Sequence, residues 1–594
     1  MLLAALAWPS SLHAEPLVVD DAALESKAAG IDRQLHGILA VPFGWGLEAY
    51  VDDPADRTLV DDFIASGSDD FEAATGTHPY DVVTRYEEVG DLGMFGGVQV
   101  AGDAFRYAVL RDGGAPAAEV DRARTQLVAA MRGLHWYTQV TGVPGVMARG
   151  IRRITPEAGE PPLPEEPPMT VPLFDASGNP QPAVKEPTWR DDASGQLPFL
   201  VWLDDTSKDQ VDGYIFALGA VYDVVADDST IPADAVAALV EDARAIGNKL
   251  MEKIDVGSGT IDLVLVDADG RPTSFHDLNA EEASPGVLLG ETFNGFNAWM
   301  ALSIVRTLHH MSGDEALGKF YRELVHTRGY PESFQCTADP CVVLPLSSIY
   351  FGTATNFSNV NMAFVAAYGL LRYENDPELA QIYRTVLEAE LYAPGVDREA
   401  RGLGQSFFDF MYAGFRVGGS FGPGEDALGQ GIATLGEAPA APYWDTEVVN
   451  CDAAEIASLD CVASDGTPLP LSDEEGWKGG VVAIDPVPMR LRPPTNFEWR
   501  SDPHSVNGGG STRLNPGAGF YTAYWMGRFL QRTTDGLDNI SPRARELPRE
   551  APPSDELEEE ASGCACGVAP SRLRAGWLLL LLSGLLCARR RAPW

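Results

Sequence analysis

Basic residues are scarce in this chain of 594 residues. It holds 43 Lys and Arg against 86 Asp and Glu, which gives a formal net charge of -43 at pH 7. Proteins that bind nucleic acids grip the phosphates with clustered Lys and Arg, so this balance argues against a nucleic-acid partner. The acids are spread along the whole chain, which is typical of a soluble surface outside the cytoplasm.

Alternating patterns of the kind expected for β-strands are also scarce, whereas long helical patterns recur in pairs joined by short turns. In each pair the first helix is apolar on nearly all sides and must be buried, while the second has one apolar stripe and packs from outside. This predicts a mostly α fold, an α/α toroid of paired inner and outer helices with irregular long loops. The expected pairs are 94–111 with 119–140, 208–225 with 233–254, 292–311 with 315–327, and 359–374 with 377–392, and a last helix over 519–532 closes the set.

An α-solenoid of helical repeats is the alternative fold. Solenoid repeats keep a fixed period, whereas the hairpins here are irregularly spaced and their linkers are long, as in the Pro-rich stretch 155–187. A toroid further requires that the inner helices, 94–111, 208–226, 292–311 and 359–375, are mutually parallel and buried.

Both ends of the chain carry patterns typical of targeting signals. Residues 1–14 hold a short apolar run that ends at Ala14, as at a signal-peptidase site, and they predict a signal peptide with a truncated start. After an acidic linker (543–563) come Cys564 and Cys566, a Leu-rich stretch (575–588) and three arginines. This order resembles the myxobacterial C-terminal sorting signal. The resemblance implies that 564–594 form such a signal with a transmembrane helix over 575–588, that a sorting protease cleaves near the Cys motif, and that the protein is transferred to the cell surface.

Few cysteines remain outside that tail. Cys336, Cys341, Cys451 and Cys461 allow three pairings, and the two short loops, 336 with 341 and 451 with 461, are the simplest. Zinc is the rival explanation, but neither pair has metal-ligand spacing with a nearby His, so we expect disulfides in an oxidising compartment. The stretch 266–274 begins like a calcium loop but lacks the Glu at its twelfth position, and it predicts a β-turn between two short strands. No metal and no cofactor is expected.

Several stretches of the body resemble a group of bacterial proteins with six-hairpin, glycosidase-like toroids. They are GMFGGVQVAGDAFRYAVL, VTGVPGVMARGI, DTSKDQVDGYIFALGAVYD, DADGRPTSF, NFSNVNMAFVAAYGLLRYE and YTAYWMGRFL, within residues 80–535. The resemblance implies a toroid domain over 15–542 with its core at 80–535. Most members of the group lack a settled activity, and the implied role is carbohydrate processing.

If the inner helices are parallel, the residues just before each of them meet on one rim. Carboxylates, amides and Arg there suit sugar hydroxyls, and an aromatic face suits a sugar ring. The candidates are Tyr86, Glu87, Glu88, Asp91, Asp205, Asp209, Asp212, Asn294, Asn297, Asn359, Asn361, Trp499, Arg500 and His504, with Asn356, Glu498, Asp502 and Asn507 beside them. The alternative for each residue is a helix cap or a complement to the helix dipole.

Asp205, Asp209 and Asp212 follow one stripe of the expected helix 208–225. Thr206 or Ser207 can cap this helix, so Asp209 and Asp212 are not needed as caps. A buried or half-buried acid needs a partner or a purpose. Glycoside hydrolysis would give these acids a purpose, because it uses two carboxyl groups on either side of the glycosidic bond.

We favour Asp91 and Asp209 as the catalytic pair of a glycoside hydrolase that acts on a poly- or oligosaccharide. A polysaccharide lyase is one alternative, in which Tyr86 or His504 removes the proton α to a uronate and Arg500 neutralises its carboxylate. A surface protein that binds glycan without cleaving it is the other.

The sorting signal is testable by mutation. The double variant Cys564→Ala/Cys566→Ala is expected to stay in the inner membrane as a precursor, because the resemblance assigns recognition to this motif. Fractionation and surface labelling of cells that express the variant measure the outcome. Normal surface display would contradict the assignment.

Overall fold

Helices are the main regular elements of this computed structural model, and its sheets are small. It describes residues 15–19, 21–87, 89–181, 187–257, 259–281, 293–337, 341, 343–416, 426–495, 497–532 and 536–548. The chain is a mostly α protein, as predicted. The predicted signal peptide, Glu88, the chain beyond Pro548, and with it Cys564, Cys566 and the spanning helix 575–588, lie outside the described residues.

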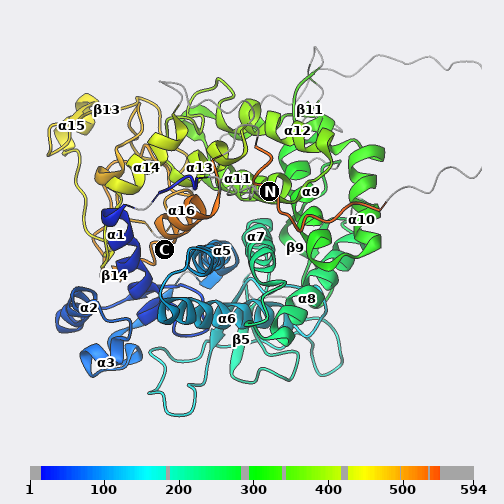
Figure 1. The fold of residues 1–594 in the computed structure, drawn as a ribbon, viewed down its shortest axis with the longest axis horizontal. Coiled ribbons are helices and arrows are strands. Elements are labelled where there is room, and N and C mark those ends of the chain that lie inside the picture. The colour runs from blue at the N-terminus through cyan, green and yellow to red at the C-terminus, as the bar shows by residue number, and fades with distance from the viewer. Residues whose placement is uncertain are drawn as a thin grey trace, which may run out of the picture. The chain divides into compact units, whose positions relative to one another are not determined.

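A closed ring of inner helices forms the centre of the fold (Figure 1). Each inner helix packs on the next in chain order, and the last packs back on the first. The inner helices are α5 (Leu92–Asp112), α7 (Lys208–Val225), α9 (Gly295–Ser312), α11 (Phe357–Tyr373), α13 (Ser406–Phe415) and α16 (Ala518–Phe529). An open superhelical row would not bring α16 back to α5, so the toroid prediction is confirmed and the solenoid alternative is wrong.

Outer helices cover the ring, and five of the six follow their inner partner directly in the chain. They are α6 (Ala117–Gln139), α8 (Ala233–Met251), α10 (Glu315–Arg322), α12 (Pro377–Val386) and α14 (Ala427–Glu437), while α1 (Ala22–Gln34) packs on α16. Helices α13, α14 and α1 were not predicted from the sequence. Helix α1 lies within the toroid domain expected at 15–542 and before the core expected at 80–535.

The inner helices run parallel, as expected. Thr522 early in α16 donates its hydroxyl to the carbonyl of Val98 in α5 (2.8 Å), and further along the same helices Phe529 stacks on Phe105 (5.0 Å between ring centres). In the other neighbouring pairs of inner helices, an earlier residue of one helix contacts an earlier residue of the next, and a later residue contacts a later one. The contacts are Gly93 with Gln210 and Phe105 with Phe216, Lys208 with Asn297 and Gly219 with Thr307, Trp299 with Ala363 and Thr307 with Gly369, Phe364 with Phe408 and Tyr368 with Phe415, and Phe410 with Gly527 and Gly414 with Leu530.

Glycines let α5 and α7 pack backbone to backbone. A Cβ atom on Gly213 would lie 2.5 Å from the Cα of Met94, and one on Gly97 would overlap the carbonyl of Gly213. No other residue type leaves this space. The starts of α5 and α7 are therefore held side by side.

Short strands and turns fill the connections. One antiparallel sheet has the order β14 (Arg513–Leu514), β1 (Glu48–Tyr50), β2 (Arg85–Glu87), and another has the order β3 (Gly150–Arg153), β5 (Leu200–Leu203), β4 (Trp189–Asp191). The pairs are β6 (Ile254–Asp255) with β7 (Thr260–Ile261), β8 (Val264–Val266) with β9 (Pro272–Asp277), β10 (Phe293–Asn294) with β11 (Val343–Leu344), and β12 (Asp460–Val462) with β13 (Pro468–Pro470). Strands β8 and β9 confirm the turn predicted within 266–274. Short helices are α2 (Pro54–Ser66), α3 (Phe71–Thr75), α4 (Pro79–Val82) and α15 (Ala453–Ser458).

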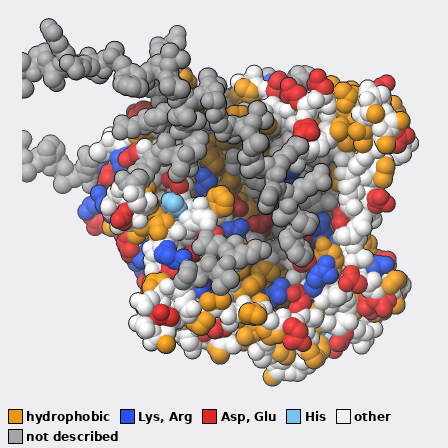
Figure 2. All heavy atoms as spheres, turned by 180° about the vertical axis from the view of Figure 1, so that it is seen from behind, with side chains coloured by type: hydrophobic (Ala, Val, Ile, Leu, Met, Phe, Trp, Pro, Cys, Tyr) orange, Lys and Arg blue, Asp and Glu red, His pale blue; other side chains and the backbone are white. Residues whose placement is uncertain are grey.

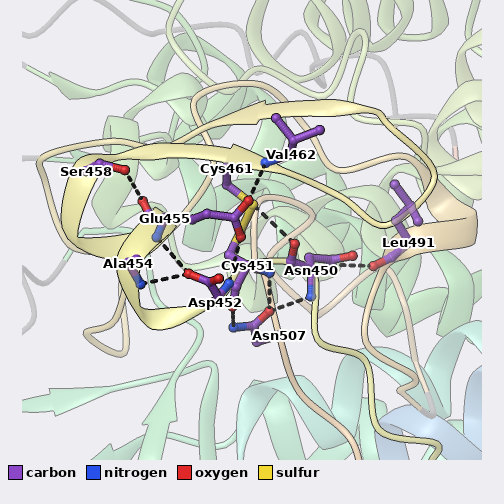
Figure 3. Close-up of a disulfide and its surroundings, with 10 residues drawn as sticks. All are labelled: Asn450, Cys451, Asp452, Ala454, Glu455, Ser458, Cys461, Val462, Leu491 and Asn507. Atoms are coloured by element: carbon purple, nitrogen blue, oxygen red, sulfur yellow. Dashed lines mark hydrogen bonds between the residues drawn. A yellow bond between two sulfur atoms is a disulfide. The ribbon is translucent and has the colours of Figure 1, made fainter.

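Residues 448–508, which we call the disulfide module, have a small hydrophobic core of their own. The disulfide between Cys451 and Cys461 lies in it, and Cys336 pairs with Cys341, so both predicted disulfides are confirmed. Figure 3 shows how Asn507 holds the module together: its side-chain oxygen accepts the N–H groups of Asn450 (2.7 Å) and Cys451 (3.0 Å), and its amide donates to the Cys451 carbonyl (2.8 Å).

Residues 536–548 cross the C-terminal ends of several inner helices. Ser541 donates its hydroxyl to Asp223 of α7, Arg545 donates to the carbonyl of His310 in α9 (2.7 Å), and Arg372 of α11 donates to the carbonyl of Asn539 (2.7 Å). This segment therefore occupies the C-terminal rim of the ring. In the part of the chain that is described, no helix is both long and apolar enough to cross a membrane.

The glycine contact between α5 and α7 can be tested against a matched glycine. Gly97→Ala is expected to lower the free energy of unfolding by about 1 to 3 kcal/mol, because the added methyl group forces the two backbones apart. Gly436 in α14 has open space around it, so Gly436→Ala should leave stability unchanged or raise it by up to about 1 kcal/mol. Urea unfolding measures both. Equal stability of Gly97→Ala and wild type would show that the contact is unimportant.

Candidate functional site

Asp91 stands directly before α5, on the rim formed by the N-terminal ends of the inner helices. Its Oδ2 accepts a hydrogen bond from the guanidinium of Arg500 (2.8 Å), and its Oδ1 lies 4.0 Å from Arg149 and accepts from the Nε2 of Gln210 (3.3 Å). About a fifth of the Asp91 side chain is exposed. Asp91 is thus a half-buried acid with a charged partner.

Asp209 and Asp91 both accept a hydrogen bond from the side-chain amide of Gln210. The Oδ2 of Asp209 accepts from the Nε2 of Gln210 (3.2 Å), and its Oδ1 accepts the hydroxyl of Ser207. The two carboxylates favoured from the sequence therefore lie within two hydrogen-bond lengths of each other. We call Asp91, Arg149, Ser207, Asp209, Gln210 and Arg500 the rim cluster.

The orientation of Gln210 follows from the packing of α5 on α7. The N–H of Met94 donates to its Oε1 (3.1 Å), which leaves Nε2 to donate to the two acids. Both acids also lie at helix N-termini, where the helix dipole favours negative charge. Ser207 occupies the N-cap of α7, but its hydroxyl binds Asp209 instead of a backbone N–H, and the hydroxyl of Thr206 faces the Ala148 carbonyl (3.4 Å). The predicted side-chain cap is therefore wrong, and Ser207 positions Asp209.

Asp212 lies one turn further along α7 and is fully buried. Burial, and secondly the charge of Asp209, raise its pKa well above the usual range. Its Oδ2 has no hydrogen-bond partner among the described residues, and neither has the Oδ1 of Asn361 in α11. The amide of Asn361 faces the sulfur of Met94 (3.6 Å). A buried acid with a raised pKa thus lies beneath the rim cluster, near the unpartnered Oδ1 of Asn361.

Polar contacts continue from α7 to α9. The ammonium of Lys208 donates to the Oδ1 of Asn297 (3.0 Å) and lies over the ring of Phe296, and the Nδ2 of Asn297 donates to Asp277 (3.2 Å). Burial lowers the pKa of Lys208 and raises that of Asp277. Asn297 therefore reaches the rim cluster only through Lys208, the neighbour of Asp209.

Two of the predicted site residues carry out structural tasks. Asp205 has a left-handed backbone (φ 62°), and its carboxylate accepts the N–H of Ser274 (2.6 Å). Asn294 caps α9 by accepting the N–H of Phe296 (3.1 Å). These two side chains are explained by turn and cap geometry, the alternative weighed from the sequence.

Residues from β2 lie apart from the rim cluster. The hydroxyl of Tyr86 is buried and donates to the carbonyl of Ile38 (2.9 Å), and Glu87 pairs with Arg85 (2.8 Å). Tyr86 and Glu87 are neighbours on a strand, so their side chains point to opposite faces of the sheet. Glu48, the cross-strand partner of Glu87, lines a cavity together with Arg500. Since Glu87 shares the sheet face of Glu48, the side chain of Tyr86 points away from this cavity.

The remaining candidates differ in exposure. Trp499 is buried and stacks on Phe407 (4.0 Å between ring centres), so it presents no free ring face. His504 is buried too: burial lowers its pKa to about 4, and its Nδ1 lies 3.1 Å from the carbonyl of Ala483. Asn359 is half-buried in the first turn of α11.

Arg500 links the rim cluster to a cavity of about 520 Å³, which we call the first cavity. Its walls include Glu48, Phe95, Asn356, Phe357, Trp477 and Arg500. Figure 2 shows a face of the protein that is hollowed in its middle, with basic and acidic side chains around the hollow. Asp91 and Asp209 are not among the residues that line this cavity, and Arg500 joins Asp91 to its wall. Two carboxylates this close together can act as an acid and base pair on a bound polar molecule.

Comparison with known proteins adds little to this site. No family model matches the chain, and no curated protein matches its sequence. Among solved structures, a sugar epimerase from a ruminal bacterium aligns with 73% of this chain and 86% of its own at 10% identity and a TM-score of 0.30. A single mutant of a thermostable endoglucanase from Alicyclobacillus acidocaldarius aligns with 85% and 83% at 13% identity and a TM-score of 0.28. At such scores neither likeness carries an argument, and the toroid assignment rests on the closed ring of this chain.

The raised pKa of Asp212 predicts a pH-dependent stability. An unfolded Asp has a pKa near 3.9, whereas burial raises the pKa of Asp212 in the folded protein. The protonated acid therefore contributes its full stability to the fold below about pH 3.9, and this stability is lost as the pH rises towards the folded pKa. The loss is at most about 1.4 kcal/mol per pH unit. Asp212→Asn should remove it, so the variant gains on wild type in urea unfolding as the pH rises above about 4. Parallel stability curves for the two proteins would contradict the buried neutral acid.

Proposed function

We propose that this protein is a carbohydrate-active enzyme, a glycoside hydrolase whose two carboxyl groups are Asp91 and Asp209. The observation that carries the proposal is their meeting at Gln210, while Arg500 joins Asp91 to the wall of the first cavity. Retaining and inverting glycosidases both place two carboxyl groups around the scissile bond. Gln210 and the backbone contact behind it hold this pair in place before any substrate arrives.

The partners of the two acids distinguish their roles. Asp91 faces the guanidinium of Arg500, while the hydrogen-bond donors to Asp209 are the neutral groups of Ser207 and Gln210. A carboxylate next to a fixed positive charge suits the nucleophile, or the base that activates water. We therefore assign that role to Asp91 and proton donation to the leaving oxygen to Asp209.

The lyase alternative has weaker support. Its proton-abstracting Tyr86 has its hydroxyl committed to Ile38, and His504 is buried with its Nδ1 at a backbone carbonyl. Its arginine, Arg500, is already paired with Asp91. A glycan-binding protein without catalysis remains the second candidate, because the same cavity and the same polar groups would serve it.

The terminal patterns and the cysteines support export. We propose that the protein is secreted through residues 1–14, that it is held in a membrane by its C-terminal helix, and that a sorting protease transfers it to the cell surface. The two disulfides are consistent with an oxidising compartment.

A glycan array with the purified domain, followed by product analysis on each hit, tests the activity. On the best substrate, Asp91→Asn and Asp209→Asn should each reduce kcat by about 10² to 10⁴, because the amide neither ionises nor donates the proton. Melting temperatures should stay near that of wild type.

Asp205→Asn is the matched control. Its amide oxygen can still accept the N–H of Ser274, so full turnover is expected. If the Asp91 and Asp209 variants also keep full turnover, the catalytic assignment is wrong. Glycan binding by wild type without any product would support the non-catalytic candidate instead.

A further inference from the structure

A second cavity, of about 570 Å³, lies between the disulfide module and the chain that follows α14. Its walls include Tyr443, Trp444, Met489, Arg492, Pro493 and Glu498. The two cavities have wall residues in common, namely Thr495, Ser501, Asp502, Ser505 and Asn507. The second cavity therefore adjoins the first across one stretch of chain, which also carries Arg500 of the rim cluster.

Glu498 is the unusual group in the wall of the second cavity. Its side chain is 4% exposed, and neither of its carboxyl oxygens has a hydrogen-bond partner among the described residues. Burial raises its pKa to about 7. Its Oε2 lies against Gly519 at the start of α16, where any Cβ atom would overlap it. Since buried polar groups are nearly always hydrogen-bonded, this carboxyl group calls for a partner from outside the protein.

Arg492, a second charged residue of the wall, is already satisfied. Its guanidinium donates to the backbone carbonyls of Leu403, Gly404 (3.0 Å) and Val487 (2.8 Å). It therefore holds the loops around the cavity together. The carboxyl group of Glu498 is left to bind a ligand.

The apolar part of the wall consists of flat rings. The indole N–H of Trp444 donates to Asp61 (2.9 Å), and the hydroxyl of Tyr443 accepts the N–H of Thr495 (3.3 Å), so both rings are fixed. Pro493 and Met489 lie beside them. Apolar faces together with a few hydrogen-bonding groups are what a sugar requires, because its ring has apolar faces and a rim of hydroxyls.

We propose that the second cavity is a further sugar subsite, in which Glu498 binds ring hydroxyls and Trp444 contacts a ring face. It follows that the substrate is an oligo- or polysaccharide with units in both cavities. This inference rests on the proposed function, since it takes the reacting bond to lie at the rim cluster. Asn507, which ties the shared wall to Cys451, makes the disulfide module the support of this subsite.

Kinetics on oligosaccharides of graded length, taken from the best array hit, test the subsite. Trp444→Ala and Glu498→Gln should each raise KM for the longer oligosaccharides about tenfold or more and leave kcat and the KM of the shortest unchanged. Trp477→Ala, which alters the first cavity, should affect all lengths alike. Glu498→Gln keeps the size of the side chain, so it remains informative if the Trp444 variant fails to fold.

The possible outcomes distinguish the proposed subsite from the proposed hydrolase activity. Hydrolysis with the same length dependence in wild type and both variants would overturn the subsite and leave the catalytic pair intact. If no hydrolysis occurs but calorimetry shows that long oligosaccharides bind, and either variant weakens this binding, the hydrolase is overturned and the subsite is supported. Absence of both binding and hydrolysis would overturn the two together.

Discussion

The backbone contact between α5 and α7 is the constraint on which the rest of the site depends. Gly97 and Gly213 permit it, although a glycine within a helix costs about 0.5 to 1 kcal/mol relative to alanine. The contact brings the N–H of Met94 to Gln210 and thereby turns the Gln210 amide towards Asp91 and Asp209. Without it, two acids that are far apart in the sequence would not share one donor.

Buried polar groups gather at both rims of the ring. At the C-terminal rim, residues 536–548 bring arginines to helix ends, as where Arg545 binds the carbonyl of His310, and cations there also suit the helix dipole. At the N-terminal rim, Asp212, Asn361 and Glu498 keep oxygen atoms without partners among the described residues. At the C-terminal rim, both ring nitrogens of His310 and the hydroxyl of Tyr373 also lack hydrogen-bond partners among the described residues, so unsatisfied groups do not distinguish the rims. The proposed site rests on the rim cluster, where two acids share one donor.

The sequence predicted the ring and the meeting of Asp91 with Asp209, because both follow from helix patterns. Helices that are apolar all round must be central, and parallel central helices must start on one rim. The direction of side chains in the loops depends on distant contacts, and no local pattern contains them. Trp499 therefore proved to be packed on Phe407, and the hydroxyl of Tyr86 proved to serve the Ile38 carbonyl. The helix α13 was missed because it is short, and the second cavity because it needs the folded disulfide module.

Charge favours a neutral glycan as the partner of this rim. A protein with a net charge of -43 repels polyanions at long range, so a uronate polymer would have to find strong local cations. The cations at the rim are already engaged: Arg500 with Asp91 and Lys208 with Asn297. Release of Arg500 would leave the half-buried Asp91 without this charged partner, at a cost that a uronate carboxylate would have to exceed. A neutral sugar forms only hydroxyl contacts, so it can bind without breaking either of these pairs.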